Sequence, residues 1–299
     1  MQNFKYHFLS LLVTALVAAS FISTAQLSGV INAFSLTLLR LFIAVIVLLP
    51  VILMKKHRMM LTKKVLAKGF VMGLFFAAFF ICMFKALETT TPLNTATLYT
   101  LVPFLTAIFS VLVFKESISL KLLLTYLIGA LGTCWVVVRG SFEVLIGMSI
   151  NQGDYLFFLG CISMVCFSIS MKFFNRYESS VVVVFCTLLG GAVWMLLALI
   201  IFEQPLGWFA MNINLSLHML YLAIFATLIS TFLIHKVTIK LGPTKVMAYI
   251  YLSPVFVAVF MWLFEGKSIP INVYPGMALS IIATLILQTT NKKPEKHND

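Results

Sequence analysis

Charged side chains are scarce in this sequence. They make up 10% of its 299 residues, whereas hydrophobic side chains make up 62% and the mean hydropathy is +1.07. A soluble domain is typically about 25% charged and about 45–50% apolar. No soluble core of this length can bury so much apolar surface. The scarcity of charge therefore excludes an ordinary soluble protein and indicates an integral membrane protein whose main partner is membrane lipid.

Several signatures of catalysis and cofactor binding are missing. The sequence contains no GxxxxGK[ST] phosphate-binding loop and no HExxH zinc motif. Its five cysteines fall in apolar segments without a CxxC spacing, which favours small buried hydrophobes over disulfides or metal ligands. We therefore expect no metal, no cofactor and no enzymatic activity. A membrane-embedded enzyme is disfavoured because the histidines are scattered, at His7, His57, His218, His235 and His297.

Long hydrophobic runs, by contrast, are abundant. A membrane-spanning helix needs about 20 predominantly apolar residues, and runs of this kind between polar breaks predict an all-α fold with ten transmembrane helices. The predicted spans are 8–27, 33–54, 66–87, 93–114, 121–139, 154–174, 181–202, 216–238, 244–264 and 271–290. The run after Lys5 resembles a signal peptide, but nine more runs follow it, so we expect an uncleaved first span.

Basic residues are distributed unevenly between the predicted loops. The net charge is +12, and most of the 21 lysines and arginines fall on the side that carries the N-terminus, above all between Lys55 and Lys68. Because cytoplasmic loops are rich in lysine and arginine, we expect a multi-pass protein with both termini in the cytoplasm. No basic domain stands outside the membrane, so we expect no nucleic-acid partner.

The two halves of the chain resemble each other around a proline. When Pro103 is aligned with Pro254, Pro92 falls on Pro243. Each half has five predicted spans, an odd number, so the second half enters the membrane from the opposite side, as in inverted-repeat membrane proteins. The predicted boundaries are 1–139 for the first five-helix repeat, 140–153 for a connecting loop, 154–290 for the second repeat and 291–299 for a disordered cytoplasmic tail.

Five segments carry recognisable patterns in a characteristic order and spacing. They are SLTLLRLFIAVIV (35–47), TLVPFLTAIFSVLVFKESIS (100–119), YLIGALGTCWVV (126–137), GDYLFFLGCISMVCFSISMKFF (153–174) and KLGPTKVMAYIYLSPVFVAVF (240–260). Together they resemble the ten-helix EamA-type branch of the drug/metabolite transporter superfamily, over nearly the whole chain.

The resemblance implies two inverted EamA-type repeats around a central cavity that opens alternately to the two sides of the cytoplasmic (inner) membrane. Members of the family export amino acids and other metabolites, or carry nucleotide sugars and related solutes. Two departures set this chain apart from many members. The segment ALVAASFISTAQ (15–26) lacks the tryptophan–glycine pair often found there, and FEGKS (264–268) has its glutamate before the glycine.

The paired prolines are candidate hinges. A proline has no N–H and so leaves the carbonyl four residues earlier without its helical partner; these carbonyls belong to Tyr99 and Ile250. In a membrane such a carbonyl must find protein, water or solute. Pro103 and Pro254 are therefore interpreted either as hinges beside a polar cavity or as packing kinks that a neighbouring hydroxyl satisfies.

Polar side chains within the spans are candidates for lining the cavity. Lining a wet cavity and bonding between helices both explain polar groups at this depth. Arg40 is open to two interpretations, an anion contact or a structural ion pair. The candidate substrate-cavity residues are Asn94, Thr97, Tyr99, Thr100, Tyr249, Ser253, Ser23 and Arg40.

Acidic residues are few, and all map to predicted loops, helix ends or the tail. They are Glu88, Glu116, Glu143, Asp154, Glu178, Glu203, Glu265, Glu295 and Asp299. Ion-coupled pathways usually bury a carboxylate, so we expect no carboxylate relay at mid-membrane. Exchange or facilitated flow is then at least as plausible as proton coupling, for which His235 is the candidate residue.

The sequence thus favours a secondary transporter of a small-molecule solute, with export of amino acids or related metabolites as the first hypothesis. Carriers of nucleotide-sugar-like, organic-cation or drug-like solutes in the same fold are the alternative. A membrane assembly protein without transport is the alternative from another class. Small residues at helical spacing, such as Gly69 and Gly73, are interpreted as close packing within the chain, and they leave a homodimer open.

Overall fold

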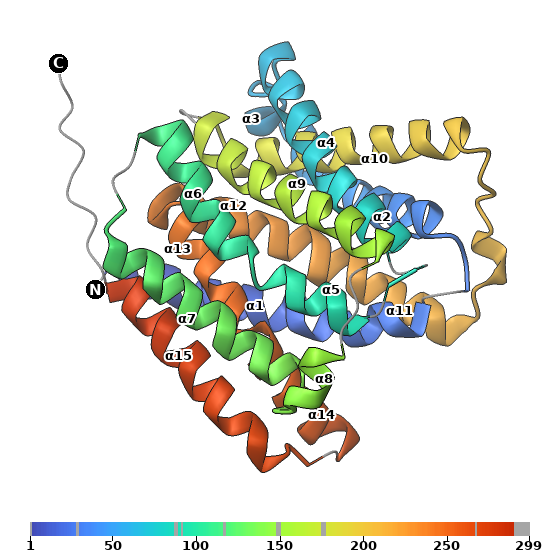
Figure 1. Cartoon of the computed structure of the whole chain (residues 1–299). Helices are drawn as coiled ribbons and strands as arrows, with labels where there is room; N and C mark the ends of the chain where they lie inside the picture. Colours follow the sequence, from blue (N-terminus) through green and yellow to red (C-terminus); the bar gives the residue numbers. More distant parts are fainter. Residues whose placement is uncertain are drawn as a thin grey trace, which may run out of the picture.

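The computed structural model describes residues 2–27, 30–86, 89–90, 92–115, 118–147, 151–174, 178–266 and 268–289. Figure 1 shows a bundle of helices, and the described part of the chain contains no strand. Nine helical segments in this part are long and apolar enough to cross a membrane, and the helix at the N-terminus adds a shorter apolar stretch, Phe4–Ser20. The prediction of an all-α membrane fold with ten spans is confirmed.

The first half contains five spans and two short connecting helices. Its helices are α1 (Gln2–Leu27), α2 (Ala33–Leu53), α3 (Lys55–Arg58), α4 (Lys63–Ala86), α5 (Pro92–Tyr99), α6 (Val102–Phe114), α7 (Leu120–Val137) and α8 (Phe142–Ile146). The spans are α1, α2, α4, the pair α5 and α6, and α7. We call the side of the bundle at which α1 begins the N-terminal face.

The second half repeats this order. Its helices are α9 (Gln152–Phe174), α10 (Ser180–Ile201), η1 (Trp208–Ala210), α11 (Ile213–Ala223), η2 (Ile224–Ile229), α12 (Ser230–Leu241), α13 (Pro243–Ala248), η3 (Tyr249–Leu252), α14 (Ser253–Glu265), η4 (Ile271–Val273) and α15 (Tyr274–Thr289). The eighth span joins α11, η2 and α12, and the ninth joins α13, η3 and α14. Because five spans precede it, α9 begins at the face opposite the one at which α1 begins.

The main packing contacts between helices have counterparts in which every helix is replaced by its equivalent from the other half. α4 packs against α9 and α10, and the equivalent eighth span packs against α1 and α2. The pairs α2–α10, α6–α13 and α7–α15 join equivalent spans directly, and Figure 1 shows α7 and α15 side by side. This contact pattern is that of two inverted repeats related by a pseudo-two-fold axis.

The fourth and ninth spans are broken at equivalent positions. α6 and α14 each have a proline, Pro103 or Pro254, in the first turn. Both helices run for 13 residues and end before a residue in the left-handed region, Lys115 with φ 53° and Gly266 with φ 63°. A proline is tolerated in the first turn because its missing N–H would have no helical partner there. Each proline therefore begins a new helical segment instead of kinking a continuous one.

Glycines let the third and seventh spans approach closely. A Cβ added at Gly69 would lie 2.3 Å from the Cβ atom of Cys186, and one added at Gly73 would lie 2.4 Å from the backbone nitrogen of Gly191. Both distances are too short for any side chain. These glycines therefore serve packing within the chain, as the sequence predicted, because small residues allow helix backbones to approach.

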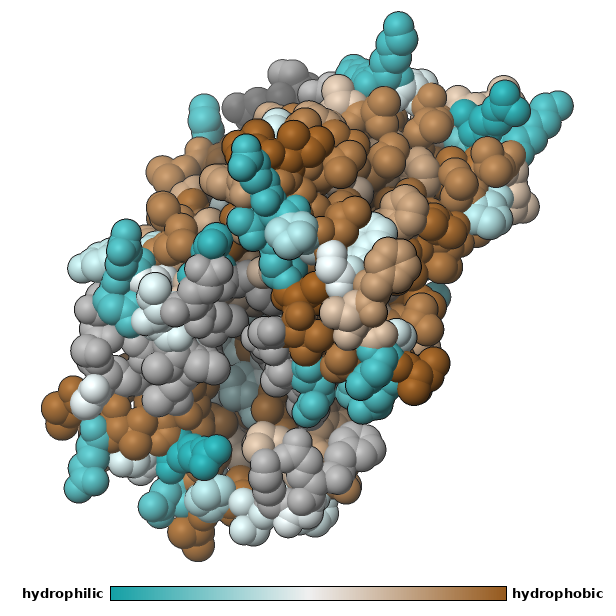
Figure 2. All heavy atoms as spheres, turned by 90° about the vertical axis from the view of Figure 1, so that its right-hand side faces the viewer, coloured by the Kyte–Doolittle hydropathy of each residue, from teal (hydrophilic) through white to brown (hydrophobic). Residues whose placement is uncertain are grey.

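The outer surface is apolar, as a lipid-facing surface must be. On the face shown in Figure 2, hydrophobic side chains cover most of the described surface, and hydrophilic side chains stand out in separate groups. Leu112, Leu131 and Ile200 are 70%, 69% and 65% exposed. Such exposure would be costly in water and is favourable in lipid.

Most predicted spans agree with the helices to within about three residues, but several features were not predicted. α1 begins at Gln2 instead of residue 8. The short helix α3 lies between the second and third predicted spans, and α8 lies in the connector 140–153. The eighth span has a π-helical segment at Ile224–Ile229, for which the sequence carries no proline or glycine signal. The predicted tail 291–299 lies outside the described residues.

Candidate functional site

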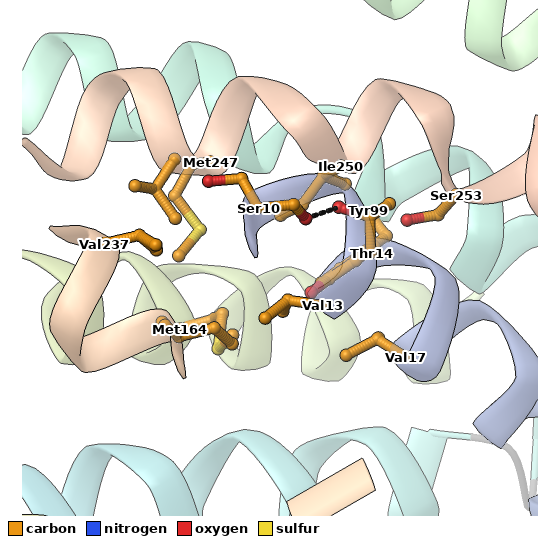
Figure 3. Close-up of a pocket in the computed structure, with 12 residues that line it drawn as sticks. Ser10, Val13, Thr14, Val17, Tyr99, Met164, Val237, Met247, Ile250 and Ser253 are labelled. Atoms are coloured by element: carbon orange, nitrogen blue, oxygen red, sulfur yellow. Dashed lines mark hydrogen bonds between the residues drawn. The ribbon is translucent and has the colours of Figure 1, made fainter. Parts of the chain in front are cut away.

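A cavity lies between the two halves of the bundle, beside the breaks in the fourth and ninth spans. Figure 3 shows side chains from α1, α9, α12, the fourth span and the ninth span converging on it. The lining residues are Ser10, Val13, Thr14, Val17, Tyr99, Met164, Ile234, Val237, Val246, Met247, Ile250 and Ser253. Tyr99 and Ile250 are equivalent positions in the repeat alignment, so the cavity sits where the two halves meet.

The cavity is small and its walls are aliphatic. Its volume is about 60 Å³, enough for a few water molecules and well below the roughly 300–1,000 Å³ of pockets for drug-sized ligands. Valine, isoleucine and methionine form most of the wall, and no lining residue carries a charge among those that the structure describes. In Figure 3, Met247 extends toward the side on which Met164 lies.

Two hydroxyl groups open into the cavity without a partner. Within the described parts of the chain, neither Tyr99 Oη nor Ser253 Oγ makes a hydrogen bond, although Ser253 is only 6% exposed. Figure 3 shows the Ser253 hydroxyl pointing toward Tyr99. One hydroxyl comes from each half of the chain. A polar group buried in a membrane protein needs a partner, so both are free to bind water or solute.

The contribution of α1 was missed by the sequence reasoning. The sequence predicts polar lining at the end of the first span around Ser23, whereas the structure places the middle of α1 against the cavity. Ser10 and Thr14 face it, but each hydroxyl donates to the carbonyl four residues earlier: Ser10 to Tyr6 O at 2.9 Å and Thr14 to Ser10 O at 2.9 Å. Their i,i+4 spacing within the otherwise apolar stretch 8–19 was the available signal.

The break in the ninth span satisfies the carbonyl that we expected to be free. Ser253 donates its N–H to Ile250 O, because the chain forms the 3₁₀ turn η3 ahead of Pro254. The expectation of a free carbonyl at Ile250 is therefore wrong, since an i→i+3 bond replaces the i→i+4 bond that proline removes. In the fourth span, Thr100 N–H donates to Thr97 O at 3.1 Å, also across three residues, and the free carbonyl at Tyr99 stays a prediction.

The remaining polar candidates near the breaks do not line the cavity. The Thr100 hydroxyl donates to Thr97 O at 2.7 Å, within its own turn. Tyr249 is buried, and a hydrogen bond of 2.7 Å joins its Oη to His7 Nδ1 on α1. His7 precedes Ser10 by one turn, so this bond lies between the cavity and the N-terminal face. The side chain of Asn94 lies outside the described residues, although its backbone belongs to α5.

Arg40 lies away from this cavity and joins the two halves. Its Nε donates to Thr227 Oγ1, its Nη2 donates to Ala226 O at 3.2 Å, and its guanidinium carbon lies 4.9 Å from the centre of the Phe80 ring. Thr227 and Ala226 belong to the π-helical segment of the eighth span. Arg40 also lines a second pocket, of about 10 Å³, with Thr24. These contacts hold the second span against the eighth; an anion contact stays a prediction.

Two other predicted residues, Ser23 and His235, are buried at separate positions outside the cavity lining. Ser23 is buried beside α11, where Oγ and His218 Nδ1 are 3.4 Å apart. His235 is 2% exposed, lies on α12 between two cavity-lining residues, Ile234 and Val237, and does not line the cavity itself. Neither of its ring nitrogens has a hydrogen-bond partner in the part of the chain that is described.

Comparison with known proteins identifies the family to which the chain belongs. A family model described as the EamA-like transporter family matches residues 4–138 and 151–289, so each match covers one five-span half. The chain belongs to the EamA-like transporter family. The resemblance noted from the sequence is thereby confirmed, and the protein is a membrane transporter of the drug/metabolite type.

Individual relatives of this EamA-like chain are distant. It is 23% identical over 217 residues to the "Uncharacterized transporter YyaM" of Bacillus subtilis (strain 168), which covers 72% of this chain and 70% of the relative. One solved crystal structure, of a protein whose name states no function, matches with a TM-score of 0.77 at 20% identity. That match covers 95% of this chain and 97% of the other, and it shows the fold alone.

Proposed function

We propose that this EamA-like protein is a secondary transporter that moves a small solute across the cytoplasmic membrane by alternating access. The observation that carries the proposal is the cavity between two inverted halves, lined by broken spans from both. In such a fold one half rocks against the other around a fixed site. The two free hydroxyls, at Tyr99 and Ser253, bind the solute, while Pro103 and Pro254 begin the segments that move.

The solute class proposed first is the amino acids and related small metabolites, exported from the cytoplasm. The absence of charge on the described lining supports a solute without several charges. A cavity of about 60 Å³ must widen to admit an amino acid, and the alternating opening of the two halves provides that change. Drug-like solutes are the second candidate, which the aliphatic walls favour.

Flux through proteoliposomes tests this proposal. Vesicles that contain the purified protein are loaded with unlabelled leucine, and entry of labelled leucine by exchange is followed. Tyr99→Phe and Ser253→Ala each remove one free hydroxyl and are expected to reduce exchange by about tenfold, the value of one hydrogen bond of roughly 1.4 kcal/mol. Unchanged exchange in both variants would contradict the proposed roles.

Two matched variants control for loss of folding. Tyr221→Phe removes a hydroxyl that donates to Leu16 O at 2.9 Å away from the cavity, and Ser216→Ala removes one that donates to Asn212 O at 2.9 Å at the surface. Both are expected to exchange leucine at the rate of the unmodified protein. If the control variants lose exchange as strongly as the cavity variants, the effect is one of stability.

The proposed orientation places both termini in the cytoplasm of a multi-pass inner-membrane protein. The connector 140–153 then lies on the opposite side. A reporter enzyme that is active only outside the cytoplasm, fused after residue 145, is expected to be active. Activity of a cytoplasmic reporter at that position would reverse the orientation and, with it, the direction of export.

A further inference from the structure

Three buried polar side chains next to the cavity have no partner for their polar atoms. Ser168 on α9 and Thr238 on α12 are fully buried, and His235 on α12 is 2% exposed. Within the described residues, Ser168 Oγ, Thr238 Oγ1 and both ring nitrogens of His235 make no hydrogen bond. Leaving one such group unsatisfied costs the free energy of removing it from water without compensation. Four of them on two neighbouring helices are not expected of a site whose only task is packing.

These side chains lie on the cavity-lining helices α9 and α12, displaced from the cavity toward the N-terminal face. Ser168 follows the lining residue Met164 by four residues, and Thr238 follows the lining residue Ile234 by four residues. In each helix this step is one turn on the same side, about 6 Å along the axis. α9 and α12 pack against each other. Ser168 and His235 each lie six residues before the end of their helix, so their depths from the N-terminal face agree.

We infer that Ser168, His235 and Thr238 form a polar sub-site for one end of the transported solute, whose aliphatic end lies against Val13, Val17 and the methionines of the cavity. This inference rests on the proposed function and narrows its solute class. The solute has one aliphatic end and one hydrogen-bonding end. Alpha-amino acids with aliphatic or thioether side chains belong to this class.

The set of donors and acceptors favours this class over phosphorylated solutes. A neutral imidazole has one donor and one acceptor, and each hydroxyl can both donate and accept. Such a set matches a solute end that offers both donors and acceptors, as an amino acid does with an ammonium that donates and a carboxylate that accepts. The diphosphate of a nucleotide sugar only accepts and carries charge that needs cations, and no lysine or arginine of the described chain lines the cavity.

Thr238→Val gives the sharpest test, because it removes only the unpartnered hydroxyl. In purified full-length protein without solute, the variant is expected to melt at or above the temperature of the unmodified protein, since no bond is lost. Its KM for leucine exchange is expected to rise about fivefold. The matched control is Thr187→Val, whose buried hydroxyl donates to Val183 O at 2.9 Å; it is expected to melt lower with an unchanged KM.

A conservative substitution at His235 gives a second test of the sub-site. His235→Gln keeps one donor and one acceptor and is expected to retain leucine exchange, whereas His235→Leu is expected to raise KM about tenfold or more. Retained exchange in His235→Gln also separates this role from proton coupling, because glutamine does not titrate. Loss of exchange in both variants with a normal melting temperature would overturn the sub-site in favour of an obligatory imidazole.

Other outcomes overturn the inference directly. If Thr238→Val lowers the melting temperature as the control Thr187→Val does, the Thr238 hydroxyl has a structural partner within the protein. An unchanged KM in that variant shows that the solute does not reach it, and exchange of UDP-glucose without leucine excludes the solute class. If neither solute exchanges, the carrier proposal fails separately. The sub-site is then judged by Thr238→Cys in a cysteine-free protein: labelling by N-ethylmaleimide supports a wet site, and no labelling refutes it.

Discussion

The crossing of the third and seventh spans can be tested with a single methyl group. A Cβ added at Gly73 would lie 2.4 Å from Gly191 N, 2.7 Å from Thr187 O and 2.8 Å from Gly190 C, all of them backbone atoms. Ordinary contacts begin at 3.4 Å, so Gly73→Ala forces the two backbones apart by about 1 Å at this point. Backbone atoms cannot move aside as a side-chain end can, and the whole crossing must open.

The expected cost follows from two opposing effects. Overpacking of a well-packed interior costs about 1–3 kcal/mol, and a rigid clash between backbones lies at the upper end of that range. Alanine gains about 1 kcal/mol over glycine in helix propensity. We therefore expect Gly73→Ala to reduce the free energy of unfolding by about 2 kcal/mol, the difference between these effects.

A neighbouring glycine in the same crossing provides the control. A Cβ at Gly191 would first meet the flexible end of Leu41, with Cδ1 at 3.3 Å. Gly191→Ala is expected to keep or raise stability, because the helix propensity gain remains and Leu41 can adjust. The assay is unfolding of the purified protein in mixed micelles by increasing SDS, followed by tryptophan fluorescence. Equal stability of the two variants would refute the close crossing.

Three more predictions concern contacts that hold the bundle together. Glu178→Gln leaves Lys68, its largely buried ion-pair partner, without a counter-charge. We expect the free energy of unfolding in SDS to fall by about 1–3 kcal/mol, and an unchanged SDS midpoint of unfolding would contradict this. Asp154→Ala removes the capping box with Asn151 at the start of α9 and the buried hydrogen bond from Thr90 Oγ1. It is expected to lower the free energy of unfolding by about 2 kcal/mol and to leave leucine exchange intact; lost exchange in folded protein would contradict a purely structural role. Arg40→Leu is expected to lower the melting temperature more than Arg40→Lys, which keeps the charge but not the two-pronged contact; the reverse order would refute the clamp on the eighth span.

The spans and the inverted repeat could be predicted because they depend on local composition. Runs of about 20 apolar residues identify helices regardless of what they pack against, and Pro103 and Pro254 mark equivalent positions in plain sequence. The start of α9 is also set locally: Asp154 accepts a hydrogen bond from Asn151 N at 2.8 Å, and Asn151 accepts one from Asp154 N at 3.2 Å.

The cavity was only partly predictable because its walls come from distant segments. The structure places Tyr99 and Ser253 beside the cavity, close to the prolines that mark their spans in the sequence, and their contact with a solute stays a prediction. Val13, Met164 and Val237 are unremarkable apolar residues in their own helices, and only the packing of α1, α9 and α12 brings them together. The bond between His7 and Tyr249 joins residues 242 positions apart, a contact that no local pattern encodes.

Access to the cavity from the two sides of the membrane tests the central claim most directly. In a cysteine-free protein carrying Met247→Cys, a membrane-impermeant maleimide is applied to one face of sealed vesicles at a time, with and without solute. Alternating access predicts labelling from each face in turn, with solute changing the balance between them. Labelling from a single face under all conditions, or from neither, would contradict the account.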